Sequence, residues 1–215
     1  MNADSLFYLS QAIAFVIALT VHEFSHALIA NKLGDSTAKY SGRLSLNPLK
    51  HIDLFGTIIV PAALLISSAP FVFGWAKPVP VNIYNLKGRY GESWVSLAGP
   101  ASNFIVAIIV ALVWRFFDVF YSNFTATWSL EFIGLLQIII WINVIFGIFN
   151  LIPVPPLDGS KILLNLLPPS KNHIKEFLIQ YGPILLIAFI FFGGGLILVP
   201  LAKLITFFLI GGLLG

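Results

Sequence analysis

The sequence predicts an all-α integral membrane protein built as a polytopic helical bundle. Of its 215 residues, 58% are hydrophobic and only 10% are charged, whereas soluble domains carry about 25% charged residues. Apolar runs recur at lengths of roughly 20 residues, which a helix needs to cross the core of a bilayer. Lys and Arg gather in the loops between these runs. The chain is therefore expected to lie in a lipid bilayer.

Four apolar segments are long enough to form spanning helices. Three of them, residues 5–30, 94–117 and 130–152, are predicted to be the core helices, and residues 178–199 are predicted to form a C-terminal helix. The run Gly193-Gly194-Gly195 is expected to bend that last helix or to let it pack closely. Residues 200–215 are apolar but too short to span alone, which predicts a final interfacial or tilted segment.

A fifth apolar segment, residues 54–74, is interrupted by Pro61, Ser67, Ser68 and Pro70. Basic residues follow the first helix, precede residue 94 and follow residue 152, whereas the loop 118–129 contains no Lys or Arg. Because basic loops remain in the cytoplasm, loop 118–129 and the N-terminus are expected to be external. Both ends of 54–74 then lie on the cytoplasmic side, which predicts a re-entrant element.

Charge and cysteine content narrow the classes of function. The net charge of +3 is small and arises from short loops, so it indicates membrane orientation and not nucleic-acid binding. The absence of cysteine excludes disulfides and thiolate metal sites. No repeat or soluble segment interrupts the pattern, so residues 1–215 are expected to form a single membrane domain, with the first helix retained and not cleaved as a signal peptide.

The motif His22-Glu23-Phe24-Ser25-His26 lies within the first predicted helix. An H-E-x-x-H pattern places two imidazoles one turn apart on one helix face, where both can bind one metal ion while the glutamate acts as a general base on water. Glu23 is the only charged residue between positions 6 and 30. Because a charge inside a bilayer is costly unless it functions or is paired, the motif is either a membrane-buried catalytic metal site or a costly coincidence.

A catalytic zinc ion usually takes three protein ligands, so a third ligand is expected. The candidate is Asp158, which follows Pro153, Pro155 and Pro156 and precedes Gly159. The prolines hold the chain extended, and the glycine allows a tight turn that would present the carboxylate. An alternative is that Asp158 caps the N-terminus of a short helix over residues 160–167. From the residues alone both readings stay open.

Together these motifs resemble the site-2 protease family of intramembrane zinc metalloproteases. The resemblance rests on HEFSH at 22–26, GPASN at 99–103 and FNLIPVPPLDG at 149–159, in this order and in a membrane setting. The stretches LNPLKHID at 46–53 and FGWAKPVPVN at 73–82 are similar to a compact prokaryotic branch of the family. That branch lacks the added PDZ or CBS domains of many relatives, so accessory membrane proteins could supply the gating.

The resemblance implies roles for particular residues. His22, His26 and Asp158 would bind one zinc ion per chain, and Glu23 would be the general base. Asn103 and Asn150 would hold the substrate backbone or the developing oxyanion. Their alternatives are an interhelical hydrogen bond for Asn103 and a helix C-cap for Asn150.

The expected activity is hydrolysis of peptide bonds in membrane-spanning or signal-peptide-like protein substrates. The expected location is the plasma membrane, with the active site toward the cytoplasmic side. An extended substrate strand is hypothesised to pair with residues 71–82. The alternatives are a catalytically inactive membrane scaffold and a metal-ion transporter, although retention of Glu23 argues against the first and the lack of further polar residues toward the external face argues against the second.

His51 and Asp53 are the alternative candidates for metal ligands. They lie together in a loop predicted to be cytoplasmic, where a structural role is favoured because three ligands are already assigned. His173 lies among charged residues and is expected at the surface.

Overall fold

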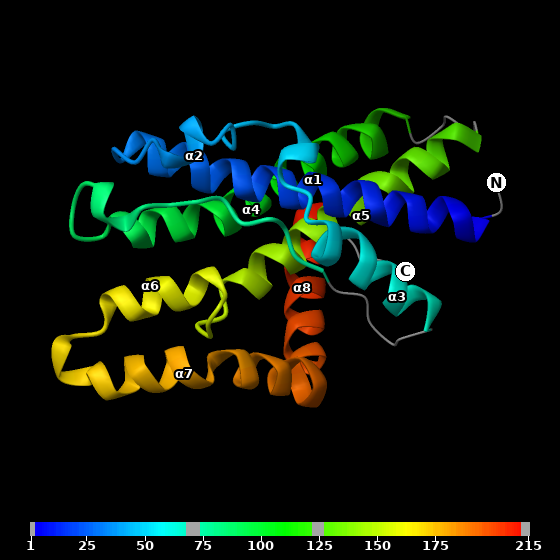
Figure 1. Cartoon of the computed structure of the whole chain (residues 1–215). Coiled ribbons are helices and arrows are strands. Elements are labelled where there is room, and N and C mark those ends of the chain that lie inside the picture. Colours follow the sequence, from blue (N-terminus) through cyan, green and yellow to red (C-terminus); the bar gives the residue numbers. More distant parts are fainter. Residues whose placement is uncertain (1–2, 68–73, 122–126, 212–215) are drawn as a thin grey trace.

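The computed structural model describes residues 3–67, 74–121 and 127–211, in which all regular structure is helical. Three long helices run side by side: α1 (Ala3–Lys32), α4 (Gly91–Tyr121) and α5 (Thr127–Asn150) (Figure 1). They correspond to the three predicted core helices, and α4 packs against both of the others. The shorter helices and α8 are arranged around this bundle.

Small side chains let α1 approach its neighbours closely. Ala14, Ala18, Ala27 and Ala30 are fully buried along this helix. Without a hydrophobic driving force between helices in lipid, small residues favour association because they allow extensive backbone contact. The buried face also carries His22 and His26.

A second core joins α4 and α5 to α8 (Gly195–Ile210). Its buried side chains are Ala107, Ala111, Ile140, Val144, Ile148, Ala202 and Ile210. The end of α8 is held by Arg115 of α4, whose guanidinium donates to the carbonyls of Leu209 at 2.7 Å and Phe208 at 2.9 Å. A cation at the C-terminal end of a helix also interacts favourably with its dipole.

The predicted re-entrant segment begins with the π-helix η2 (Leu54–Ile59) and continues as α3 (Val60–Ile66), while residues 68–73 lie outside the described residues. The Trp75 amide donates to the Gly56 carbonyl at 3.0 Å, and a Cβ on Gly56 would meet the Trp75 ring at 2.4 Å. The two ends of the segment therefore meet, which a segment crossing the bilayer could not do.

The C-terminal region differs from the prediction of one helix at 178–199. Helix α7 (Asn172–Phe189) starts earlier, the π-turn η5 (Ile190–Gly194) interrupts it, and α8 continues to residue 210 in a different direction (Figure 1). Gly193 departs from helical dihedral angles, so the glycine run does bend the chain as expected. Residues 200–210 are consequently part of α8 and not a separate segment, and residues 212–215 lie outside the described residues.

Among the described residues, four helical stretches are long and apolar enough to cross a membrane: residues 6–32, 91–116, 132–150 and the bent stretch 169–210. The chain is thus a multi-pass membrane protein. Short helices connect these stretches; they are α2 (Thr37–Tyr40), η1 (Pro48–Lys50), η3 (Ile83–Asn85) and α6 (Asp158–Leu166). The bent stretch itself begins with η4 (Pro169–Lys171).

Candidate metal centre

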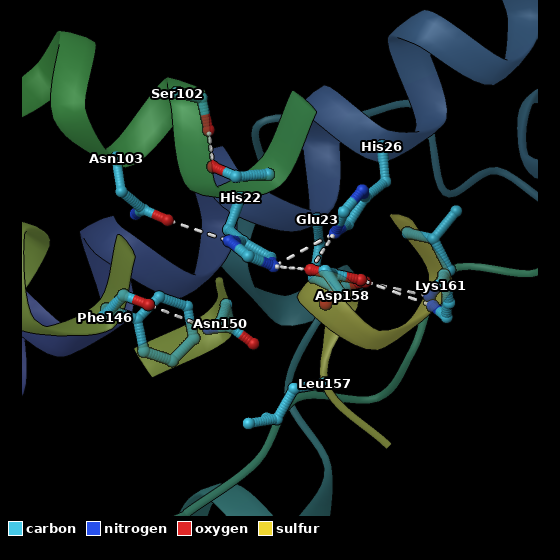
Figure 2. Close-up of polar contacts among 12 residues, drawn as sticks. His22, Glu23, His26, Ser102, Asn103, Phe146, Asn150, Leu157, Asp158 and Lys161 are labelled. Atoms are coloured by element: carbon cyan, nitrogen blue, oxygen red, sulfur yellow. Dashed lines mark hydrogen bonds and ion pairs between the residues drawn. The ribbon is translucent and has the colours of Figure 1, made fainter. Parts of the chain in front are cut away.

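Three side chains from two distant parts of the chain meet at one point. Asp158 Oδ2 lies 3.0 Å from His22 Nε2 and 3.0 Å from His26 Nε2, and the two Nε2 atoms lie 3.0 Å apart. All three residues are buried, and they form the group with metal-ligand geometry in the described part of the chain. Figure 2 shows both rings directing Nε2 toward the carboxylate. The two histidines lie one turn apart on α1, and the start of α6 brings the Asp158 carboxylate to them.

The other nitrogen of each ring faces an acceptor outside this group. His26 Nδ1 lies 2.7 Å from the backbone carbonyl oxygen of Val95, and His22 Nδ1 lies 2.8 Å from Oδ1 of Asn103. The Phe146 ring packs edge-on against His22, with ring centroids 5.0 Å apart. Contacts of this kind fix the orientation of metal-binding imidazoles.

Asp158 is the first residue of α6, the helix that follows the Pro-rich segment. The N-cap position of α6 is occupied by Leu157, so Asp158 does not cap this helix and the capping alternative is wrong. Gly159 is needed for close packing and not for a turn, because a Cβ there would lie 2.2 Å from the Leu151 carbonyl oxygen. The second carboxylate oxygen of Asp158 accepts from Lys161 Nζ at 3.3 Å, an ion pair that the helical i, i+3 spacing could have indicated.

The carboxylate of Asp158 is held in its charged form. Burial alone would raise its pKa, but the contacts with His22 and His26 outweigh burial and hold the pKa of Asp158 well below its usual range. A carboxylate must be deprotonated to bind a metal ion.

Glu23 is partly buried beside the two histidines on α1 (Figure 2). Its Oε2 accepts a hydrogen bond of 2.9 Å from the backbone amide of Val79. This contact was not predicted, because nothing in the sequence indicates which backbone amide of an irregular segment faces a given side chain.

Buried charges hold the segment that carries Val79. The Arg43 guanidinium donates to the carbonyls of Lys77 and Pro78. Further along, Asp35 is fully buried and accepts from the Asn82 amide at 2.7 Å. Burial would raise the pKa of Asp35, but hydrogen bonds from Thr37, Asn82 and Asn85 outweigh it and lower this pKa. Two ionised side chains thus fix the chain on either side of Val79.

The same segment was hypothesised to pair with a substrate strand. Residues 71–73 lie outside the described residues. The amides of Trp75, Lys77 and Val79 already donate within the protein, and Pro78 and Pro80 have no N–H. Strand pairing needs alternating donors and acceptors. The carbonyls of Trp75, Lys77 and Pro78 also accept within the protein, so this backbone is poorly suited to pairing with a substrate strand.

The two predicted substrate-positioning residues lie in different surroundings. Asn103 is fully buried, and its amide bonds to His22 and the Ala18 carbonyl of α1 and to Asn143 of α5. The interhelical hydrogen bond named as its alternative is therefore present. Asn150 ends α5 and donates to the Phe146 carbonyl at 3.0 Å, which corresponds to its alternative as a helix-end residue.

The remaining candidate ligands lie outside the cluster. His51 is fully buried, with Nε2 2.7 Å from the Ser45 carbonyl, and Asp53 caps η2 by accepting from the Gly56 amide at 2.7 Å. His173 is exposed. His51 and Asp53 thus make structural contacts, as expected, and His173 lies at the surface.

The three clustered donors fit a zinc ion. Ligand atoms about 2.0–2.1 Å from a tetrahedral zinc ion lie roughly 3.3 Å apart, close to the 3.0 Å separations observed. Gly99 of α4 leaves the space open, since a Cβ there would lie 2.5 Å from His26 Nε2 and 2.6 Å from His22 Nε2. Two imidazoles and one carboxylate are the protein ligands of many hydrolytic zinc sites, in which water takes the fourth position.

Comparison with known proteins also indicates a zinc-dependent enzyme family. Residues 10–190 match peptidase family M50. The YwhC protein of Bacillus subtilis, named as a candidate zinc metalloprotease, is 39% identical over 79% of this chain and 74% of its own length. The Zinc metalloprotease MJ0392 of Methanocaldococcus jannaschii is 23% identical over 80% of this chain and 39% of its own length.

A third relative is Rip2 of Mycolicibacterium smegmatis, also named as a candidate zinc metalloprotease, which is 31% identical over 78% of this chain and 61% of its own length. No solved structure matches the chain significantly. The family match covers most of the chain and includes all the residues of the cluster. The chain belongs to peptidase family M50, the site-2 protease family that its motifs resemble.

Proposed function

We propose that the protein is an intramembrane zinc metalloprotease that hydrolyses peptide bonds of membrane-spanning or signal-peptide-like proteins. The observation that carries the proposal is the meeting of His22, His26 and Asp158 next to Glu23 on an apolar helix. Burying polar and charged side chains in a membrane-spanning helix costs free energy, and such residues are therefore usually functional. Family membership and the names of the relatives support metal-dependent peptide hydrolysis.

The chemistry can be assigned to residues of this chain. A bound zinc ion would supply a Lewis acid that makes water more acidic and polarises a peptide carbonyl. Glu23 would take the proton of the attacking water at Oε1, because Oε2 accepts from Val79, and would return it to the leaving amine. A substrate helix must first unwind locally, since its carbonyls are engaged in its own hydrogen bonds.

Asn150 is the proposed substrate-positioning residue. Only one hydrogen of its amide nitrogen is needed for the bond to Phe146. The other hydrogen and the amide oxygen can contact a substrate backbone or stabilise a developing oxyanion. Asn103 is not proposed for this task, because its amide is enclosed between helices.

We also propose that the site faces the cytoplasmic side of the plasma membrane. The histidines lie in the half of α1 that ends at Lys32, and Asp158 follows the end of α5. Lys32, Lys39 and Lys161 belong to the basic loops around these ends. Water would enter from that side.

Metal removal tests the proposed function. The purified protein in detergent is incubated with a panel of tagged single-span reporter proteins, including signal-peptide sequences. At least one reporter is expected to be cleaved, and a zinc chelator should abolish the cleavage until zinc is restored. Cleavage that persists in the metal-depleted protein would contradict the proposal.

A further inference from the structure

Arg43 is a buried cation that forms no ion pair with a carboxylate of the described residues. Its relative exposure is 7%, and the ion pairs in the described part of the chain involve other residues. The guanidinium donates to the carbonyls of Lys77 and Pro78, to the latter at 3.4 Å, while its Nε finds no hydrogen-bond partner among these residues. A buried charge is costly unless polar groups compensate it, so these two carbonyls compensate the charge of Arg43.

Glu23 lies at the opposite end of one of these peptide groups. The Pro78 carbonyl and the Val79 amide belong to the same peptide unit, and this amide donates to Glu23 Oε2 at 2.9 Å. A cation therefore lies at the oxygen of the peptide and a carboxylate at its N–H. Each polarises the peptide and so strengthens the hydrogen bond at the other end. The peptide thus connects two opposite charges that form no ion pair with each other.

The other anchors of this segment do not fix the orientation of the 78–79 peptide. Hydrogen bonds from the amides of Lys77 and Asn82 hold the chain on either side of it. A proline ring locks its own φ, but the plane of this peptide turns about ψ of Pro78 and φ of Val79, which neither flanking ring locks. The contacts with the guanidinium and the carboxylate at its two ends therefore set this orientation.

We propose that Arg43 is a positioning residue for the general base: through the 78–79 peptide it holds Oε2 of Glu23 in place and leaves Oε1 free to accept the proton of water. This inference rests on the proposed function. Without the guanidinium, the Pro78 carbonyl loses its donor, the peptide can turn, and the Val79 amide leaves Oε2. The carboxylate then samples several rotamers, and fewer of them are suitable for proton transfer.

The sequence allows this peptide to be observed almost alone by NMR. Proline is followed by valine only at positions 78–79, 80–81 and 153–154. Full-length protein in detergent, labelled with ¹³C-carbonyl proline and ¹⁵N-valine, therefore gives three carbonyl-coupled amide signals. The ¹³C shift of Pro78 and the ¹H shift of Val79 report the two ends of the same peptide. The Val154 amide, which donates to the Ile152 carbonyl at 2.8 Å, is an internal reference.

Arg43→Met replaces the guanidinium with an apolar side chain. We expect the Pro78 carbonyl and Val79 amide signals to shift together toward weaker hydrogen bonding, and the Val79 amide to exchange faster with solvent, while Val154 is unchanged. Arg43→Lys restores a charged donor and should return both signals toward their wild-type positions. The control Arg89→Met changes an exposed arginine, whose guanidinium lies over the Tyr90 ring, and should shift none of these signals.

The same variants are compared in cleavage of a reporter that the wild-type protein cleaves. Arg43→Met should lower kcat about 10-fold to 100-fold, as expected for a displaced catalytic group, with KM and zinc content unchanged. Arg43→Lys should recover most of this loss. In a Glu23→Gln background Arg43→Met should have little further effect on kcat, whereas general destabilisation would lower kcat in both backgrounds.

The outcomes distinguish this inference from the proposed function. Wild-type Pro78 and Val79 signals in folded Arg43→Met, or an equal loss of kcat in both backgrounds, would overturn the role of Arg43. If Arg43→Met does not fold, Arg43→Gln, which keeps a donor but not the charge, is judged by the same two signals. Absence of reporter cleavage by the wild type would instead contradict the proposed function, and the NMR signals would still decide whether Arg43 orients the peptide that contacts Glu23.

Discussion

Replacing Glu23 with Gln is expected to lower the rate of peptide hydrolysis about 10²-fold to 10⁴-fold, the usual contribution of a general base, while zinc binding is retained. Glutamine has nearly the shape of glutamate, and its oxygen can still accept from the Val79 amide. It cannot accept a proton from water, however. Cleavage of a reporter identified with the wild-type protein, measured beside zinc content, checks this prediction.

A suitable control is Glu176→Gln, which removes an exposed glutamate from α7. It should leave both cleavage and zinc content at wild-type values. If Glu23→Gln cleaved the reporter as fast as wild type, Glu23 would not be the base. A wild-type protein that cleaves none of a broad reporter panel but binds zinc would favour the inactive-scaffold alternative.

Gly99→Ala is expected to abolish zinc binding without weakening the helix. A glycine inside a helix costs about 0.5–1 kcal/mol relative to alanine, so helix propensity alone predicts a gain in stability. At this position the added Cβ would lie 2.5 Å from His26 Nε2 and 2.6 Å from His22 Nε2, in the space between the two ligand atoms. Zinc content of the purified variant and its thermal unfolding temperature test the two effects separately.

Gly134→Ala provides the matched control. Gly134 lies in α5, and a Cβ there would meet nothing within 4 Å. This variant should bind zinc as the wild type does, with equal or slightly higher thermal stability. Zinc bound at wild-type stoichiometry and affinity by Gly99→Ala would show that the metal does not lie between His22 and His26.

Much of the fold could be predicted because apolar length and loop charge are direct consequences of the bilayer. The core helices 94–117 and 130–152 correspond to α4 and α5 with small shifts at their ends. The C-terminal helix was misjudged for a physical reason. The residues on both sides of the glycine run at 193–195 are strongly apolar, so hydropathy cannot indicate where one apolar helix ends and the next begins in a new direction.

The parts of the site that depend on residue spacing within one helix could be predicted. The parts that depend on the distance between segments far apart in the sequence could not. The spacing of His22 and His26 on a helix indicated two ligands, and the prolines and the glycine around Asp158 made it the candidate third ligand, which the resemblance then supported. The role of Gly99 follows from how closely α4 approaches α1, and the Val79 contact with Glu23 follows from how residues 77–82 are anchored. Neither distance is encoded in a sequence pattern.

Asn103 illustrates the same limit in a single residue. Its place in GPASN indicated a polar function near the site, which the contact with His22 bears out in location. In the structure it is buried between α1, α4 and α5 and joins all three helices by its hydrogen bonds. A sequence cannot distinguish an interhelical role from a substrate contact, because both require the same amide at the same depth.

The zinc stoichiometry of the purified protein, measured beside His22→Ala and Asp158→Ala, tests the central claim most directly, because it needs no substrate. Wild type and the control His173→Ala, which changes an exposed histidine, should each hold about one zinc ion per chain, the number that a single three-ligand site binds. Both cluster variants should lose it. Zinc retained by Asp158→Ala at wild-type affinity, or no zinc in wild type purified without chelator, would contradict a centre formed by His22, His26 and Asp158.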